Sequence, residues 1–192
     1  TTTNTVIGAT PTETSLTVTG STTLTSVTNT FNGSGSAMGT AALSQFALAD
    51  ASNFATAGTV KIGNEFFTYT GKSGNNLTGV VRAREDSTAV SHAHGATVTQ
   101  VIGSTDTMAG SGVIKADTTN FTASGSIKIG NEFFTYTGKT GSTFTGVTRA
   151  ASNTTAAIHE PTAGITQALT TSDTTLNVGD TAGFPTAGTL LI

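Results

Sequence analysis

The chain contains no cysteine and no tryptophan, and only 10% of its 192 residues are charged, whereas soluble domains carry about 25%. Without cysteine, neither a disulfide framework nor a thiolate metal centre can form. Only 8 residues are Lys or Arg and the formal net charge is −3, so no basic surface is available for a phosphate backbone, and nucleic-acid binding is not expected. No apolar run approaches the ~18 residues of a membrane-spanning helix.

Threonine is the most frequent residue, and glycine, with 23 copies, is also abundant. Threonine is β-branched and fits a pleated sheet, while its hydroxyl keeps an exposed face wettable. The small net charge also argues against disorder driven by charge repulsion. This composition predicts an all-β protein of tandem small β-modules, made of short antiparallel hairpins in a sandwich-like or barrel-like arrangement, after an N-terminal β segment.

An internal repeat organises the chain: Lys61–Lys72 recurs letter for letter as Lys128–Lys139. A repeat of this kind indicates tandem structural modules. A third copy begins at Asp173 and stops at Ile192, which aligns with Ile129 in the middle of the repeated stretch. Either the natural chain continues or another subunit completes that sheet. The predicted divisions are an N-terminal Thr-rich β segment with a Gly/Ser linker (1–42), module 1 (43–109), module 2 (110–172) and a truncated third module (173–192).

The repeated stretch is predicted to form a hairpin around a Gly63-Asn64 turn, because this dipeptide tolerates positive φ. Ile62 then faces Glu65, and Val60 faces Phe67. The alternation of side chains along a strand assigns one face to Val60, Ile62, Glu65, Phe67 and Tyr69, and the other to Lys61, Phe66, Thr68 and Thr70. A strand from Leu77 to Arg82 follows, with position 81 facing solvent. Its counterpart in module 2 is Phe144–Arg149.

Two other regions are predicted to be extended. Residues 14–19 and 22–27 alternate weakly and are predicted to pair around a Gly20-Ser21 turn, as a hairpin that needs another surface to be stable. Residues 41–54 are compatible with one helical turn, but their counterpart around 113–117 favours a strand for both copies.

His92 and His94 are the candidates for a metal site, because alternate residues of a strand point the same way. Module 2 has only His159 at the corresponding place, followed by Glu160-Pro161. The favoured interpretation is nevertheless a loop histidine that hydrogen-bonds the backbone, so no metal site is assigned. No cofactor site is expected.

Glu65 with Arg82, and Glu132 with Arg149, are interpreted as structural ion pairs at the edge of the apolar face. The alternative, an acid with its electrostatic partner, is not favoured because catalysis by paired carboxylates needs two acids across one cleft. Each module offers one such glutamate, so the chain is not expected to be an enzyme. Asp50, Asp117 and Asp180 are interpreted as Asx-turn residues rather than calcium ligands, and Tyr69 and Tyr136 as core residues rather than a sugar-stacking platform.

The order of residues 58–71, then Leu77-Thr78-Gly79-Val80 with Arg82, then His92 and Gly95, resembles a module found repeatedly in bacteriophage virion structural proteins. These are tail-fibre, tail-tip and appendage proteins. The resemblance covers residues 43–192, and residues 14–27 more loosely resemble Thr-rich fibre-shaft repeats. It implies a homotrimer, with metal binding through His-x-His pairs in some members. The glycine that usually follows the arginine is replaced here by Ala83 and Ala150.

From these observations we expect a non-enzymatic structural component of a phage virion, a fibre, tail or capsid appendage that serves assembly and host-surface attachment. Its expected partners are copies of itself, with a trimer favoured, other virion proteins, and a host surface glycan or protein. The alternative is a subunit of an extracellular bacterial or archaeal surface filament, in which residues 1–30 are donated to a neighbouring subunit. A fibre-borne glycan depolymerase is a third, less favoured interpretation.

Overall fold

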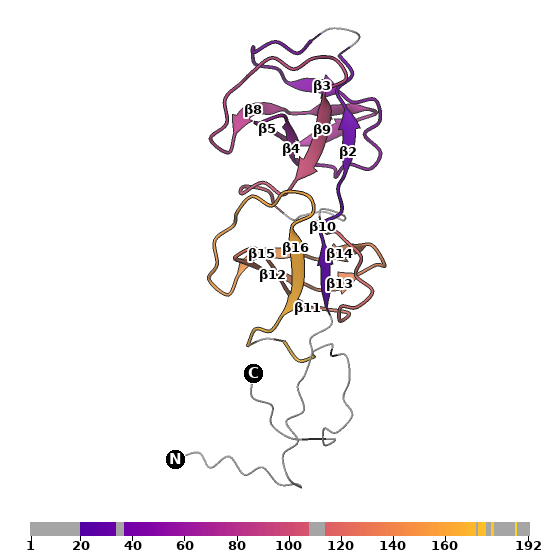
Figure 1. The fold of residues 1–192 in the computed structure, drawn as a ribbon, viewed down its shortest axis with the longest axis vertical. Helices are drawn as coiled ribbons and strands as arrows, with labels where there is room; N and C mark the ends of the chain where they lie inside the picture. The colour runs from indigo at the N-terminus through magenta and orange to yellow at the C-terminus, as the bar shows by residue number, and fades with distance from the viewer. Residues whose placement is uncertain are drawn as a thin grey trace.

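The computed structural model describes residues 20–33, 37–107, 114–171 and 173–175, together with the single residues Val178 and Ala187. All the regular elements in these ranges are β-strands, which confirms the all-β expectation. Two similar β-modules lie one above the other along the longest axis of the molecule (Figure 1). Each module combines a five-stranded antiparallel sheet with a three-stranded one.

Module 1 contains a five-stranded sheet in the order β2-β9-β4-β5-β8 and a three-stranded sheet in the order β3-β7-β6. The strand bounds are β2 (Thr28–Thr30), β3 (Gln45–Ala47), β4 (Gly58–Ile62), β5 (Glu65–Tyr69), β6 (Gly71–Ser73), β7 (Asn76–Thr78), β8 (Val81–Arg84) and β9 (Thr97–Val101).

Module 2 repeats this topology, with the orders β1-β16-β11-β12-β15 and β10-β14-β13. The strand bounds are β1 (Ser21–Thr23), β10 (Ile114–Lys115), β11 (Gly125–Ile129), β12 (Glu132–Tyr136), β13 (Gly138–Lys139), β14 (Thr143–Thr145), β15 (Thr148–Ala151) and β16 (Gly164–Ala168).

The central hairpin β4–β5 has the predicted register, with Ile62 opposite Glu65 and Val60 opposite Phe67. Gly63 in the turn has a φ of 59°, which explains the need for glycine there. The predicted inner face is buried along both strands, while Lys61, Phe66 and Thr68 of the outer face are partly exposed. The regions around 45–47 and 114–115 are strands, as favoured by sequence, although both are short.

The strand predicted from Leu77 to Arg82 is wrong as a single element, because the chain leaves one sheet and enters the other within it. Strand β7 belongs to the three-stranded sheet and β8 to the five-stranded sheet. Between them, Gly79 has a φ of 62°, and a Cβ at this position would overlap the Thr70 side chain. Val81, the first residue of β8, is 51% exposed, which confirms the prediction that position 81 faces solvent.

The N-terminal segment differs most from expectation. Strand β1 pairs with β16 of module 2 and strand β2 pairs with β9 of module 1, two long-range pairings that the predicted hairpin around Gly20-Ser21 does not include. Residues 14–19 lie outside the described residues. We call residues 20–31 the N-terminal strap, because this one extended segment supplies the first strand of the five-stranded sheet in both modules (Figure 1).

Each module has its own apolar core, and the strap contributes one large side chain to each. Leu24 is 6% exposed and packs in the core of module 2, which contains Ile129, Phe134 and Phe144. Phe31 is 5% exposed and packs in the core of module 1, edge-on against Phe46. A module of some 65 residues is only marginally stable, because so small a domain buries a small fraction of its surface. The shared strap adds buried apolar area to both modules.

Ala83 and Ala150 adopt left-handed backbone conformations, with φ values of 53° and 52°. A side chain disfavours this region, so Ala83→Gly and Ala150→Gly are each expected to raise the free energy of unfolding by about 0.5–1 kcal/mol. The same change at the neighbouring Ala151, which pairs with Phe133 and is not among the residues with positive φ, is the matched control and is expected to lower it. Urea titration of the three variants measures the difference. A destabilised Ala150→Gly variant would contradict this explanation.

Candidate functional site: the Glu–Arg–His clusters and the junction between modules

A buried glutamate begins strand β5, and an arginine on the neighbouring strand β8 faces it. Arg82 Nε donates to Glu65 Oε1 at 2.8 Å, and Nη2 donates to Oε2 at 2.7 Å. The side chains are 5% and 0% exposed, respectively. This fork-to-fork arrangement is the strongest geometry for an arginine–carboxylate pair, and it is the ion pair that the sequence predicts.

His92 completes the cluster, contrary to its interpretation as a loop histidine bound to the backbone. Its Nε2 lies 2.8 Å from Glu65 Oε2, and the ring packs against Phe67 with centroids 5.7 Å apart. The Val90 backbone amide also donates to Glu65 Oε2, at 3.0 Å. Arg82 in turn donates to the carbonyl oxygens of Val90 and Gly39. One carboxylate therefore organises a strand, a loop and the segment that enters the module.

Module 2 reproduces the same cluster around Glu132. Arg149 Nε and Nη2 donate to its two oxygens at 2.9 and 2.8 Å. His159 Nε2 lies 2.8 Å from Oε2, and the Ala157 amide donates to the same oxygen at 2.9 Å. The guanidinium lies over the ring of Phe134, 5.5 Å from its centroid. The cluster therefore occurs once in each module, which indicates that it contributes to the folding of the module.

Each cluster holds the carboxyl group of its central glutamate in the ionised form. Burial raises the pKa of Glu65, but hydrogen bonds from Arg82, the Val90 amide and His92 outweigh it and lower the pKa from 4.5 to about 2. Glu132 has the same balance, with Arg149, the Ala157 amide and His159 as donors, and the same value of about 2. Both carboxylate oxygens are already committed, so neither glutamate is arranged to exchange a proton with a substrate.

Acid unfolding tests this balance. A carboxylate whose pKa is lowered on folding contributes stability that is present above its unfolded value and lost as pH falls towards its folded value. The free energy of unfolding is therefore expected to decline from about pH 4.5 to pH 2, by about 3 kcal/mol for each module. Urea titrations across this range measure the decline. Glu132→Gln should remove the part of the slope due to module 2, and an unchanged slope would contradict the account.

His92 and His94 do not form the metal site suggested by their spacing. His92 is 7% exposed and faces Glu65, whereas His94 is exposed. The chain turns at residues 94–95 instead of continuing as a strand, so the alternation on which the prediction relied does not apply. Within the described ranges, no group of three or more His, Asp or Glu side chains is placed to hold a metal ion.

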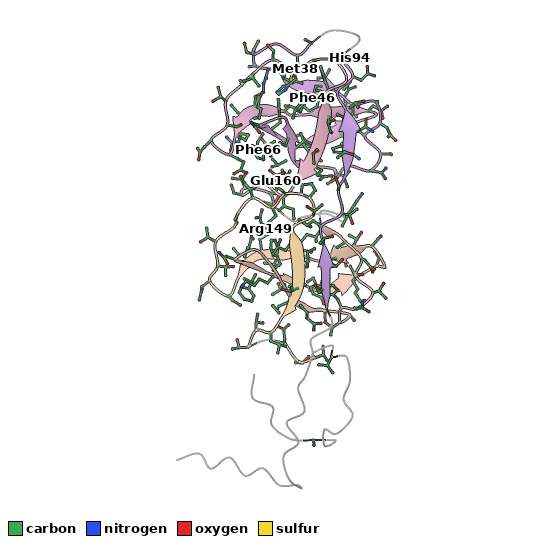
Figure 2. The ribbon with its side chains drawn as sticks, viewed as in Figure 1. Met38, Phe46, Phe66, His94, Arg149 and Glu160 are labelled. Atoms are coloured by element: carbon green, nitrogen blue, oxygen red, sulfur yellow. The ribbon has the colours of Figure 1, made fainter. Side chains whose placement is uncertain are left out.

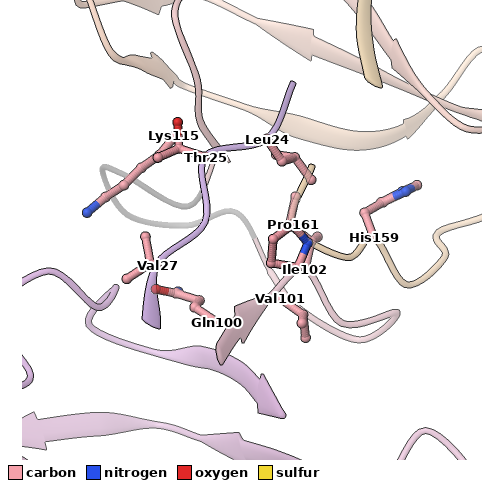
Figure 3. Close-up of a pocket in the computed structure, with 9 residues that line it drawn as sticks. All are labelled: Leu24, Thr25, Val27, Gln100, Val101, Ile102, Lys115, His159 and Pro161. Atoms are coloured by element: carbon pink, nitrogen blue, oxygen red, sulfur yellow. The ribbon is translucent and has the colours of Figure 1, made fainter. Parts of the chain in front are cut away.

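The junction between the modules is built from the segment that follows strand β9. Ile102 forms a β-bridge with His159, which brings the exit of module 1 against the cluster of module 2. Arg149 donates to the carbonyl oxygen of Gly103. Glu160 accepts from Lys61 of module 1 at 2.6 Å, although this exposed pair contributes little to stability. Figure 3 shows a narrow pocket at this junction, between the strap, the end of β9 and the loop carrying Pro161.

Asp106 orders the exit loop itself. Its carboxylate accepts from Thr59 Oγ1 at 2.7 Å and from the Gly103 amide at 2.8 Å. Glu85 receives two further hydrogen bonds from Ser104, from its amide at 2.7 Å and from its hydroxyl at 2.6 Å. These contacts fix the direction in which the chain leaves module 1.

Other repeated polar residues have structural roles. The Asx-turn interpretation is confirmed for Asp50 and Asp117, whose Oδ1 atoms accept from the amides two residues later at 2.8 and 3.0 Å; Asp180 lies outside the described residues. Tyr69 and Tyr136 are core residues, each 2% exposed. Lys72 donates to the carbonyl oxygens of Ala51 and Phe54 at 2.8 and 2.6 Å.

Sequence reasoning missed the roles of Lys72, of Asp106 and of the histidines. A signal for all of them was present: Lys139, Asp173 and His159 recur at the offset of the repeat. Each of these three retained residues makes at least one equivalent contact in both modules.

In the part of the chain that the structure describes, no helix is long and apolar enough to cross a membrane. No protein-family model, curated protein or solved structure matches this chain.

Proposed function

We propose that this protein is a structural component of a bacteriophage virion, part of a fibre, tail or capsid appendage, and that it has no enzymatic activity. The observation that carries the proposal is the end-to-end stacking of two equivalent modules on one shared strap (Figure 1). Such an arrangement extends the molecule along one axis and adds length with each repeat, as a fibre or appendage requires.

The polar clusters support a structural role over a catalytic one. Glu65 and Glu132 belong to different modules, and each is already held by its own arginine and histidine. They do not face one another across a cleft, as a pair of glycosidase carboxylates does. This geometry favours a role in assembly over that of a fibre-borne depolymerase.

The alternative of a donor-strand surface filament requires residues 1–30 to pair with a neighbouring subunit. Strands β1 and β2, which belong to that segment, pair with β16 and β9 of the same chain. The described part of the proposed donor is therefore already used within the chain, and we favour the virion component.

Fractionation of the source organism tests the proposal. Phage particles purified from induced cultures by density gradient should contain this chain, as detected by peptide mass spectrometry, and labelled antibodies against modules 1 and 2 should decorate an appendage of the particle. Sedimentation of the purified chain should give a trimer. Recovery of the chain only in a sheared cell-surface filament fraction would overturn the virion assignment and support the alternative.

A further inference from the structure

We propose that Asn32 is the site of a spontaneous modification, in which the backbone nitrogen of Gly33 attacks the side-chain amide of Asn32 and converts it to aspartate or isoaspartate. The reaction consumes only water and releases ammonia, so it requires neither an enzyme nor a cofactor. Asn32 directly follows Phe31, the last residue of the N-terminal strap. This inference concerns the chemistry of the chain itself and does not rest on the virion assignment.

The residue after Asn32 is what distinguishes it in the sequence. Asn32-Gly33 is the only Asn-Gly dipeptide among the 192 residues, and every other asparagine is followed by a residue with a side chain. Closure of a five-membered ring requires the backbone nitrogen of the next residue to approach the side-chain carbonyl carbon of the asparagine. Glycine has no Cβ to hinder that approach, and its backbone is the least restricted. Gly33 therefore makes Asn32 the asparagine that reacts most readily.

The structure leaves both reacting groups accessible. Asn32 is exposed and Gly33 is partly exposed, so water reaches the amide. Asn32 is held on its N-terminal side, because its backbone amide donates to Ala47 O at 2.8 Å. Within the described ranges, neither the Asn32 side-chain amide nor the Gly33 backbone amide has a hydrogen-bond partner. The Gly33 amide is therefore free to lose its proton and to turn towards the Asn32 side chain.

Other asparagines in turns differ at this point. The amides of Phe54, Phe121 and Thr154, each of which follows an asparagine, donate to the carbonyl oxygen three residues earlier at 3.1 Å. Asn64 and Asn131, in the hairpin turns, precede glutamates that are paired within the sheets. An amide in such a hydrogen bond has to leave it before it attacks a side chain, and breaking the bond is unfavourable. The fold therefore protects these asparagines and leaves Asn32 unprotected.

Asn29, in strand β2 of the strap, is an internal comparison. Its Oδ1 accepts from the amides of Thr30 and Asp50 at 2.8 and 3.0 Å. Both the side chain of this asparagine and the amide of the next residue are therefore already engaged. Thr30 also carries a β-branched side chain, which crowds the backbone at the point of attack. Two asparagines three positions apart thus differ in both the sequence and the structural requirement.

The reaction balances without an oxidant or a reductant. The Gly33 nitrogen gives its proton to a base in the solvent and forms a bond to Cγ of Asn32, the bond from Cγ to Nδ2 breaks, and ammonia leaves with a proton from the solvent. Water then opens the succinimide ring at one of its two carbonyl carbons. Cleavage of the new bond gives aspartate, and cleavage of the original peptide bond gives isoaspartate, with the main chain passing through Cγ. Either product adds one negative charge to a chain whose formal net charge is −3.

Incubation of the full chain at mildly alkaline pH tests the proposal, because base removes the amide proton. Peptide mass spectrometry is expected to show aspartate and isoaspartate at position 32, as two peptides of equal mass that separate by chromatography. In water labelled with heavy oxygen, each product should carry one labelled oxygen atom. Conversion at Asn32 should be at least about tenfold faster than at Asn29 or Asn153 in the folded chain. Conversion at Asn32 that is absent, or no faster than at these two, would overturn the proposal.

Two comparisons separate the contribution of the sequence from that of the fold. Gly33→Ala should slow the conversion at least about tenfold, because the added Cβ hinders ring closure. In urea, Asn153 should convert faster than in the folded chain, because the Thr154 amide is released, whereas the rate at Asn32 should change by less than about threefold. A strong acceleration of Asn32 on unfolding would overturn its assignment as an accessible site in the folded chain. An unchanged rate in Gly33→Ala would overturn the role of glycine.

Discussion

Arg82→Leu is expected to lower the free energy of unfolding of module 1 by about 3–5 kcal/mol. The substitution leaves the Glu65 carboxylate buried with 0% side-chain exposure and without its cation. Removing one partner of a buried pair exposes the full cost of desolvating the other, which exceeds the modest net value of the intact pair. Urea denaturation, followed by hydrogen exchange to assign the loss to a module, measures the effect.

The chain offers a matched control on the same strand. Arg84 lies two residues further along β8 and is exposed, so Arg84→Leu is expected to change stability by less than about 0.5 kcal/mol. Adding Glu65→Gln to Arg82→Leu should recover most of the loss, because the remaining buried group is then neutral. Equal effects of the two arginine substitutions, or no recovery in the double variant, would contradict a buried charge cluster as the organising contact.

Leu24→Asp is expected to have a comparable effect on module 2, about 3–5 kcal/mol, because it combines the loss of a buried leucine with the burial of a carboxylate. Leu24 is 6% exposed in that core. Hydrogen exchange should show lost protection in β16 and β11, with β9 and β4 retained. Phe31→Asp should give the reciprocal pattern, with the loss confined to module 1.

The control for the strap is Thr23→Asp, an exposed residue beside Leu24 on the same segment. It is expected to change stability by less than about 0.5 kcal/mol. If Leu24→Asp destabilised both modules equally, the strap would not consist of separate units. If it destabilised neither, the strap would not contribute to the core of module 2.

The hairpin could be predicted from sequence because its determinants are local. The Gly63-Asn64 turn and the period-2 alternation around it specify both the register and the buried face. The Glu65–Arg82 pair followed from the same pattern, since the two residues lie on neighbouring strands and are seventeen positions apart in the sequence. Both copies of the stretch obey these rules, which is why the prediction held twice.

The strap could not be predicted in this way, because its pairing is not local. Ser21 lies opposite Thr166, and no periodicity within residues 20–31 identifies a partner so distant in sequence. Gly20 suggested a turn, but the structure uses it for close approach: a Cβ there would lie 2.7 Å from Gln167 Cβ. A short strand rich in Ser and Thr has the same sequence pattern whether it pairs in a local hairpin or at the edge of a sheet formed by residues far away in the sequence.

The contact that His92 makes with Glu65 could not be predicted from sequence for a related reason. His92 and His94 are two residues apart, and strand alternation would put them on one side. The turn after His92 breaks that alternation, and the buried carboxylate that receives His92 comes from a strand 27 residues earlier in the chain. At Ala83 and Ala150 the local sequence pattern was informative. The resembling module has glycine after the arginine, and the backbone at both of these positions is left-handed.

The pairing of the strap with its own chain is the central claim, and engineered disulfides test it most directly. Ser21 and Thr166 lie directly opposite one another and are both exposed. The adjacent pair, Gly20 and Gln167, is hydrogen-bonded, because the Gln167 amide donates to Gly20 O. Ser21 and Thr166 therefore form a non-hydrogen-bonded pair, in which the two Cα atoms lie closer together, and this spacing suits a disulfide. Because the sequence has no cysteine, Ser21→Cys/Thr166→Cys is predicted to form a disulfide within each chain, so that the oxidised protein runs as a single chain on a denaturing non-reducing gel. The mismatched Ser21→Cys/Thr99→Cys is not expected to form this bond. Disulfide-linked dimers or ladders from the matched pair on a non-reducing gel would contradict the account and place the strap in a neighbouring subunit.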